Sequence, residues 1–247
     1  MRRTLGVVCA VALLASVSPV RADDDEAKLR AIIDKAIKAH GGADNLKKFK
    51  GEVVKSKGTF YGMGEGIEYT ETMSVQYPNQ MRIDIEGANF KFTQVFNKDK
   101  GWRKINDDTE ELKEEKAEVA EQMYAAMVTN LVVLQDTSYK LSPLGENKVG
   151  DRAAVGVRVE HKGHRPISLY FDKDKGLLLK AETTGKDMRN DNKEFTSEEL
   201  FSDYKKVGEL MVAHKVRINR DGKKYVEAEV TECKHSEKLD DSVFAKP

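Results

Sequence analysis

Apolar residues recur at every second position in segment after segment of this chain, and this period of two constrains the fold more than any other feature. Met73, Val75 and Tyr77, for example, alternate with polar residues. Such alternation is typical of strands in an antiparallel sheet, which have one face on the core and the other in water. The clearest of these strands are predicted near residues 72–77, 82–86, 90–92, 155–160, 167–172, 177–179, 212–218 and 225–230.

The pattern supports about ten or eleven strands in all, and strands and helices do not alternate as they would in a parallel α/β fold. Turn signals such as Pro78-Asn79 and Asp174-Lys175-Gly176 separate neighbouring strands. We therefore predict an α+β fold that is mostly antiparallel β. Its main element is expected to be one broad, curved sheet with helices covering the concave face.

Two helices are expected beside the sheet. The first has apolar residues at helical spacing over residues 29–37 and stops at Gly41-Gly42. The second is predicted over residues 109–135, because Asp108 followed by Glu111 fits a capping box. Its apolar stripe consists of Leu112, Val119, Met123, Met127, Leu131 and Leu134. Its second half is apolar on nearly all sides, which fits either ordinary packing against the sheet or a movable lid.

Residues 1–22 fit a removable secretory signal. Arg2 and Arg3 precede an apolar run at residues 5–17, and Val20-Arg21-Ala22 offers a site for a signal peptidase. The run has about 13 residues where a bilayer span needs roughly 20, so a retained anchor is the weaker alternative. Removal of the signal would leave residues 23–247 as a single predicted domain with 39 basic and 42 acidic residues. This charge balance does not favour a nucleic-acid partner.

Patterns for catalysis and metal binding yield no site. The glycine run at residues 62–66 precedes a predicted strand, which favours a hairpin over a phosphate-binding loop. His161 and His164 flank a turn without accompanying ligands, and we expect that turn to be exposed to solvent. Cys233 is predicted to be an ordinary strand side chain. The sequence also contains no nucleophile elbow and no zinc-protease motif. We therefore predict a non-enzymatic protein with no catalytic residues, no metal and no cofactor.

A curved sheet of this size has a concave apolar side that two helices fill only in part, and this geometry predicts a ligand cavity. Its expected lining comes from the apolar strand faces and the stripe of the second helix: Met73, Val75, Phe90, Phe92, Met123, Met127 and Leu131. Methionines suit such a lining because thioether side chains repack around different ligands. Trp102, the only tryptophan, belongs either to this lining or to ordinary core at the start of a strand.

Seven further segments carry a resemblance to a known family. They are residues 39–42, 77–82, 97–102, 170–178, 203–208, 213–216 and 239–247. Together they resemble the outer-membrane lipoprotein carriers of bacteria, the LolA/LolB-like superfamily, and above all its divergent periplasmic members. The resemblance implies an incomplete, half-open β-barrel of about 11 strands with helices as a lid. It also implies a hydrophobic cavity for the acyl chains of lipoproteins, with an inner-membrane donor and an outer-membrane receiver as partners.

The resemblance also suggests a role for Arg82. Pro78 and Arg82 look like the family's Pro-x-x-x-Arg strand, whose arginine holds the lid shut in the best-known carrier. Alternation alone places Arg82 on the wet face of its strand, so both interpretations stay open. Cys9 follows only eight residues, too few for a complete lipoprotein signal, which does not favour a lipid-anchored receptor. We expect a soluble, monomeric periplasmic carrier of lipoproteins or other acylated ligands, with a non-carrying envelope adaptor as the alternative.

Overall fold

The computed structural model describes residues 21–187 and 190–247, and one antiparallel sheet dominates it. In space its 13 strands follow the order β6-β5-β4-β3-β2-β1-β13-β12-β11-β10-β9-β8-β7. In chain order the strands are β1 (Gly51–Phe60), β2 (Ile67–Gln76), β3 (Gln80–Gly87), β4 (Phe90–Asn97), β5 (Lys100–Ile105), β6 (Asp108–Glu111), β7 (Lys140–Val149), β8 (Arg152–Glu160), β9 (Ile167–Asp172), β10 (Leu178–Asp187), β11 (Lys193–Val207), β12 (Leu210–Arg220) and β13 (Lys223–Ser236). The prediction of a broad, mostly antiparallel sheet is confirmed.

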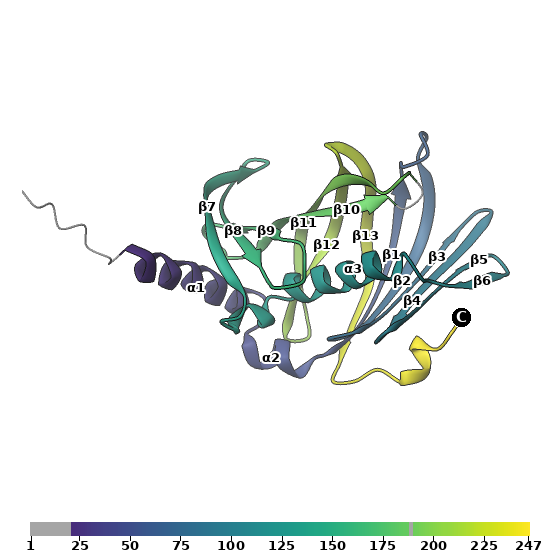
Figure 1. Cartoon of the computed structure of the whole chain (residues 1–247). Helices are drawn as coiled ribbons and strands as arrows, with labels where there is room; N and C mark the ends of the chain where they lie inside the picture. Colours follow the sequence, from purple (N-terminus) through teal and green to yellow (C-terminus); the bar gives the residue numbers. More distant parts are fainter. Residues whose placement is uncertain (1–20, 188–189) are drawn as a thin grey trace, which may run out of the picture.

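The first and last strands pair at the centre of this sheet. Residues of β1 and β13 are matched from Gly51 with Ser236 to Phe60 with Val226. From this central pair, β2 to β6 extend the sheet in one direction and β12 to β7 in the other (Figure 1). The edge strands β6 and β7 are not paired with each other, so the sheet curves without closing into a barrel. The half-open architecture that the family resemblance implies is therefore present, with 13 strands instead of about 11.

Strands β6 and β11 are among the strands that lack an apolar alternation in the sequence. Strand β6 has the sequence Asp-Thr-Glu-Glu, and it joins the sheet through its backbone pairing with β5. Strand β11 is rich in charged residues, and polar Ser197 and Glu199 alternate with Phe195 and Phe201 on one of its faces. Because backbone hydrogen bonds require no particular side chain, both segments form strands without an apolar alternation.

The helix predicted over residues 109–135 is wrong in its first part. Residues Asp108–Glu111 form β6, so no capping box exists there. Helix α3 spans Lys116–Thr129, and the short 3-10 helix η1 spans Val132–Gln135. Leu131 separates the two, since its φ of 73° lies in the left-handed region that a right-handed helix cannot use. Pairing with the sheet edge at one end and the turn at Leu131 therefore shorten the helix.

Two helices pack at one end of the strands (Figure 1). Helix α1 (Arg21–Ala39) contains the helix predicted at residues 29–37 and ends before Gly41-Gly42, as expected. Gly41 has a φ of 124°, and a Cβ there would lie 2.5 Å from the backbone oxygen of Glu209. Glycine alone permits this conformation and this close approach. The chain then turns into helix α2 (Ala43–Lys48).

The core lies between the helices and the concave face of the sheet. The larger cluster of buried residues joins α1, η1 and the end of α3 to β8, β9 and β10. The smaller cluster joins the start of α3 to β2, β3 and β4. Met127 packs against both clusters, so α3 connects the two halves of the core. In Figure 1 this helix lies across the middle of the sheet.

The C-terminal segment covers part of the opposite face of the sheet. The 3-10 helix η2 (Asp241–Phe244) contacts β3 and β4, and the Phe244 side chain is fully buried. Arg82 on β3 donates a hydrogen bond to the backbone oxygen of Val243 at 3.3 Å, and Asn97 on β4 donates to that of Phe244 at 3.1 Å. The last residues of the chain therefore brace the outside of the sheet.

Two predictions about export and extent stay predictions. Residues 1–20, which hold most of the predicted signal, lie outside the described residues. The single domain over residues 23–247 is likewise a prediction. Within residues 21–187 and 190–247, no helix combines the length and the apolar composition that crossing a membrane requires.

Candidate functional site

Two cavities lie between helix α3 and the concave face of the sheet. The large cavity has a volume of about 570 Å³ and the small cavity of about 240 Å³. Both reach Ala126 and Thr129 on α3 and Met73 on β2, so together they form one hollow that the helix divides. Small-molecule sites usually measure roughly 300–1,000 Å³, and the large cavity falls within that range.

Apolar side chains from both halves of the sheet line the large cavity. They are Met73, Met81, Ile83 and Phe92 from β2, β3 and β4, and Phe195, Ile218 and Tyr225 from β11, β12 and β13. Strand register accounts for the first group, because Met73 is paired with Ile83 and their side chains share the face toward α3. The lining also includes charged residues of α3 and of the turn between β8 and β9. An apolar surface beside charged groups suits a ligand with an apolar tail and a polar head.

Ion pairs hold one side of α3 to the turn between β8 and β9. Arg165 Nη2 lies 2.8 Å from Glu118 Oε2, and Arg165 Nε lies 3.6 Å from Glu121 Oε2. His164 Nδ1 lies 2.9 Å from Glu121 Oε1. The side chains of Arg165 and the two glutamates are only 19–25% exposed. Hydrogen bonds to charged groups in such places contribute about 1.5–3 kcal/mol each.

Polar contacts also hold the other side of α3, to β4 and β5. Arg103 Nη2 lies 3.1 Å from Glu115 Oε1, and Gln94 donates a hydrogen bond to Gln122 at 3.1 Å. The helix is therefore attached along both sides by side-chain contacts, with the hollow beneath it. Breaking these contacts does not break the sheet, so this attachment fits fixed packing and a movable lid equally well.

A stack of aromatic rings fixes α3 to the same turn. The ring centres of Tyr124 and His164 lie 3.9 Å apart, with 6° between the ring planes. His161 stacks on Tyr139 with a separation of 4.4 Å between ring centres. The turn predicted at the two histidines is confirmed. Lys162 and Gly163 within the turn are exposed to solvent, as predicted, whereas His161 and His164 are half-buried because the two tyrosine rings stack on their imidazoles.

Glu199 and Glu71 are two of the carboxyl groups on the face of the sheet that is turned toward the hollow. Glu199 on β11 lines the large cavity, and Glu71 on β2 lies two positions before Met73 on the same face of the strand. Burial, together with the charge of Glu71, raises the pKa of Glu199 to about 7. Burial also raises the pKa of Glu71. The cause is the loss of water around the ionised carboxylate. Near neutral pH the hollow therefore carries less negative charge than its composition indicates.

The small cavity lies where α3 approaches α1 and α2. Its lining includes His40, Leu46, Phe49, Val75, Tyr77, Phe201, Tyr204, Leu210 and Val216. Burial lowers the pKa of His40, which favours its neutral form. The His40 ring meets the Tyr204 ring edge-on, with 5.6 Å between ring centres. Most of this surface is apolar or neutral, so it extends the apolar part of the hollow.

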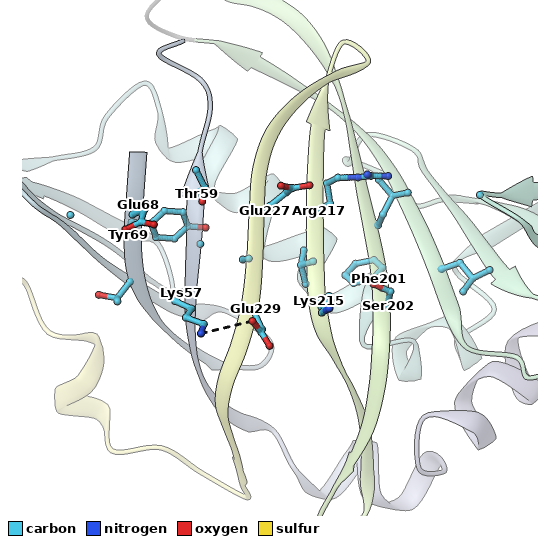
Figure 2. Close-up of a pocket in the computed structure, with 18 of the residues that line it drawn as sticks. Lys57, Thr59, Glu68, Tyr69, Phe201, Ser202, Lys215, Arg217, Glu227 and Glu229 are labelled. Atoms are coloured by element: carbon cyan, nitrogen blue, oxygen red, sulfur yellow. Dashed lines mark ion pairs between the residues drawn. The ribbon is translucent and has the colours of Figure 1, made fainter. Parts of the chain in front are cut away.

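A third and larger groove, of about 980 Å³, lies on the other face of the sheet (Figure 2). Of the described residues that line it, none belongs to α3. Figure 2 shows charged side chains of both signs across β2, β1, β13 and β12, including Lys57 and Glu229, which form an ion pair of 3.9 Å. Such a mixture is typical of a sheet face in water. We therefore place the candidate site in the hollow under α3.

The structure brings most of the predicted site residues to the concave face. The strand residues that line the hollow are Met73, Val75 and Phe92. The residues that pack in the core beside them are Met123, Met127 and Leu131. Phe90 shares the face of Phe92 on β4, where its ring lies over Gly87, but it lines neither cavity.

Arg82 and Trp102 lie on the opposite face of the sheet. Arg82 donates hydrogen bonds to both carboxylate oxygens of Asp84, at 2.6 and 2.8 Å, and a third to Val243 in the C-terminal segment. Both Arg82 and Trp102 are paired with Val95 in the sheet, so their side chains share one face. The structure thus places Arg82 beside the C-terminal segment and away from α3.

Most polar residues of the site have no local signal in the sequence. Arg165 and Glu118 are separated by 47 positions, and no local pattern links them. Glu199 did have a local signal, because it lies two positions before Phe201 on one face of β11. Because this charged segment is a strand, Glu199 lies on the same face as Phe195 and Phe201.

Solved structures of other proteins share this architecture. A DUF1329 family protein from Desulfovibrio piger is 13% identical with a TM-score of 0.59, over 88% of this chain and 97% of that one. A LolA superfamily protein from Nitrosomonas europaea is 10% identical with a TM-score of 0.58, over 88% of this chain and 97% of that one. The chain has a LolA-like fold.

The LolA-like fold is also found in an outer membrane lipoprotein-sorting protein domain from Vibrio parahaemolyticus. It is 11% identical with a TM-score of 0.58, over 89% of this chain and 97% of that one. No family model and no curated protein matches this chain. The resemblance seen in the sequence is thus confirmed at the level of the fold.

Proposed function

We propose that this protein is a periplasmic carrier that binds the acyl chain of a lipid or lipoprotein in the hollow under α3. The observation that carries the proposal is the pair of cavities between the concave sheet and a helix that is attached from its sides. The LolA-like fold supports it, since proteins with that fold include one described as lipoprotein-sorting. The predicted secretory signal supports the location.

Burial of the acyl chain would supply the affinity. Each buried methylene contributes about 0.8 kcal/mol, so a chain of about fifteen would gain roughly 12 kcal/mol. Ordering of the ligand and displacement of α3 offset part of this gain. The remainder would still make unaided release slow. Delivery would therefore need a receiver with higher affinity, or a conformer of the carrier with lower affinity.

Helix α3 is the element expected to move when a ligand enters. Its buried residues include Met123, and Met127 beside it is partly buried between the two core clusters. Thioether side chains repack with little cost, so this segment can adapt to an acyl chain in place of its present contacts. The ion pairs of Arg165 would then determine how readily the helix separates from the β8–β9 turn.

One observation favours a second candidate, an envelope adaptor without cargo. Helix α3 lies across the middle of the hollow and buries Val119, Met123 and Val128. The hollow is therefore divided and partly filled in this conformation. An adaptor would keep it filled and use the outer surface of the fold to bind a protein.

Lipid analysis of protein purified from its native host separates these candidates. A carrier should yield bound lipid or acylated peptide by mass spectrometry, and after extraction it should bind a fluorescent fatty acid. Repeated preparations without lipid, together with no binding of the probe, would rule out the carrier and leave the adaptor. Recovery of hydrolysed instead of intact lipid after incubation would indicate an enzyme.

A further inference from the structure

Three potential metal ligands meet on the central strand pair of the sheet. Glu52 on β1 is matched with His235 on β13, and Cys233 lies two positions before His235 on the same face. Cys233 Sγ lies 3.5 Å from Glu52 Oε1 and 3.6 Å from His235 Nε2, and His235 Nε2 lies 3.2 Å from Glu52 Oε1. A thiol, an imidazole and a carboxylate thus point at one another from a backbone whose register is fixed.

The separations of these three atoms match the edges of a zinc coordination tetrahedron. Zinc lies about 2.3 Å from sulfur, about 2.0–2.1 Å from histidine nitrogen and about 2.0–2.2 Å from carboxylate oxygen. At tetrahedral angles these bonds place sulfur about 3.6 Å from nitrogen or oxygen, and nitrogen about 3.4 Å from oxygen. The three observed separations agree with these values to within about 0.2 Å. One ion therefore fits among the three atoms with little movement of the side chains.

We propose that Glu52, Cys233 and His235 form a Zn²⁺ site with three protein ligands. The donor set suits zinc, which binds thiolate, imidazole and carboxylate. Binding would replace the thiol proton of Cys233 with the metal and release that proton to solvent. The site would join β1 to β13, the pair that connects the two halves of the sheet.

The site borders the small cavity. The side chains of Glu52 and His235 line that cavity and are 21% and 10% exposed. Among the described residues, the possible metal ligands in this cluster are Glu52, Cys233 and His235, so the protein supplies three ligands. The fourth tetrahedral position is therefore assigned to water. Sequence patterns cannot reveal the site, because Glu52 and Cys233 are 181 positions apart.

Metal binding to the purified, chelator-treated full chain tests this proposal. We expect one Zn²⁺ per chain by elemental analysis, and a thiolate-to-cobalt charge-transfer band when Co²⁺ is added instead. Cys233→Ser should remove the band and weaken zinc binding at least about tenfold, and His235→Gln should weaken it to a similar extent. His214→Gln is the matched control, because His214 is also partly buried but hydrogen-bonds the backbone of Val212. It should bind metal as the unchanged protein does.

Circular dichroism of each variant would confirm that it folds before metal is added. If Cys233→Ser does not fold, the cobalt spectrum of the unchanged protein and the zinc affinity of His235→Gln still decide. A cobalt spectrum without a thiolate band would overturn the proposal. Equal zinc binding by His235→Gln and His214→Gln would also overturn it and show that the three side chains only hydrogen-bond one another.

Discussion

Replacing Glu199 with glutamine should stabilise the folded protein at alkaline pH. Burial beside Glu71 raises the pKa of Glu199 from 4.5 to about 7. A raised carboxyl pKa means that the folded state holds the proton more tightly than the unfolded chain does. The free energy of unfolding should therefore fall as the pH rises from about 4.5 to about 7 and then level off. Each pKa unit corresponds to 1.36 kcal/mol, so Glu199→Gln should gain at most about 3 kcal/mol at pH values above this range.

Urea denaturation of the two proteins on either side of that pH range measures this difference. Trp102 is the only tryptophan and can report the transition. Glu194→Gln is a suitable control, because Glu194 lies exposed near the start of the same strand. It should leave the pH dependence as it is in the unchanged protein. If Glu199→Gln keeps the pH dependence of the unchanged protein, the account of the hollow as a poorly solvated site for Glu199 is wrong.

The same reasoning links ligand binding to pH. An acyl chain over Glu199 would remove further water from the carboxyl group and raise its pKa further. Binding would then take up protons, and the Kd of a fatty-acid probe should increase as the pH rises past about 7. In Glu199→Gln this part of the pH dependence should disappear.

Three further substitutions probe helix α3 and the C-terminal segment. Arg165→Ala removes the ion pair with Glu118 and should increase amide hydrogen exchange in α3 at least about tenfold. Arg158→Ala, the control, removes an exposed ion pair on β8 and should leave that exchange unchanged. Equal exchange in the two variants would show that the ion pairs of Arg165 do not hold α3 in place. Phe244→Ala should lower the free energy of unfolding, measured by urea denaturation, by about 3–5 kcal/mol, because the ring is fully buried. A loss below about 1 kcal/mol would show that the C-terminal segment is not part of the core. Arg82→Ala removes hydrogen bonds to Asp84 and Val243 and should destabilise the protein by about 1–3 kcal/mol. It should leave the Kd of a fatty-acid probe unchanged. A changed Kd would instead support the lid role that the family resemblance implies.

The sheet shows which parts of the structure a sequence can predict. Local alternation predicts that Met73 and Val75 lie on one face of a strand, and both line the hollow. Alternation depends only on the residues of one strand, so it can be recognised without knowing which strands lie beside it. The same rule places Arg82 on the other face, and the strand register confirms that placement.

Long-range pairing is the part that the sequence could not supply. The central strand pair matches Gly51 with Ser236, and no local signal specifies which strand lies beside β1. The local sequence likewise predicts a helix cap at Asp108, but that residue begins β6, which pairs with β5. The contacts of Arg165 with α3 and the meeting of Glu52 with Cys233 depend on these pairings. The polar contacts of the hollow and the cluster of Glu52 and Cys233 therefore depend on the tertiary fold and cannot be predicted from local sequence.

Blocking the hollow is the most direct test of the account. Ala126→Phe places a ring where α3 meets both cavities, and Ala117→Phe places the same ring at an exposed position of the same helix. Both variants and the unchanged protein would be titrated with a fluorescent fatty acid after urea denaturation has shown that they are folded. We predict that Ala126→Phe weakens binding at least about tenfold and that Ala117→Phe changes it less than about twofold. Equal binding by all three proteins would contradict a ligand site under α3.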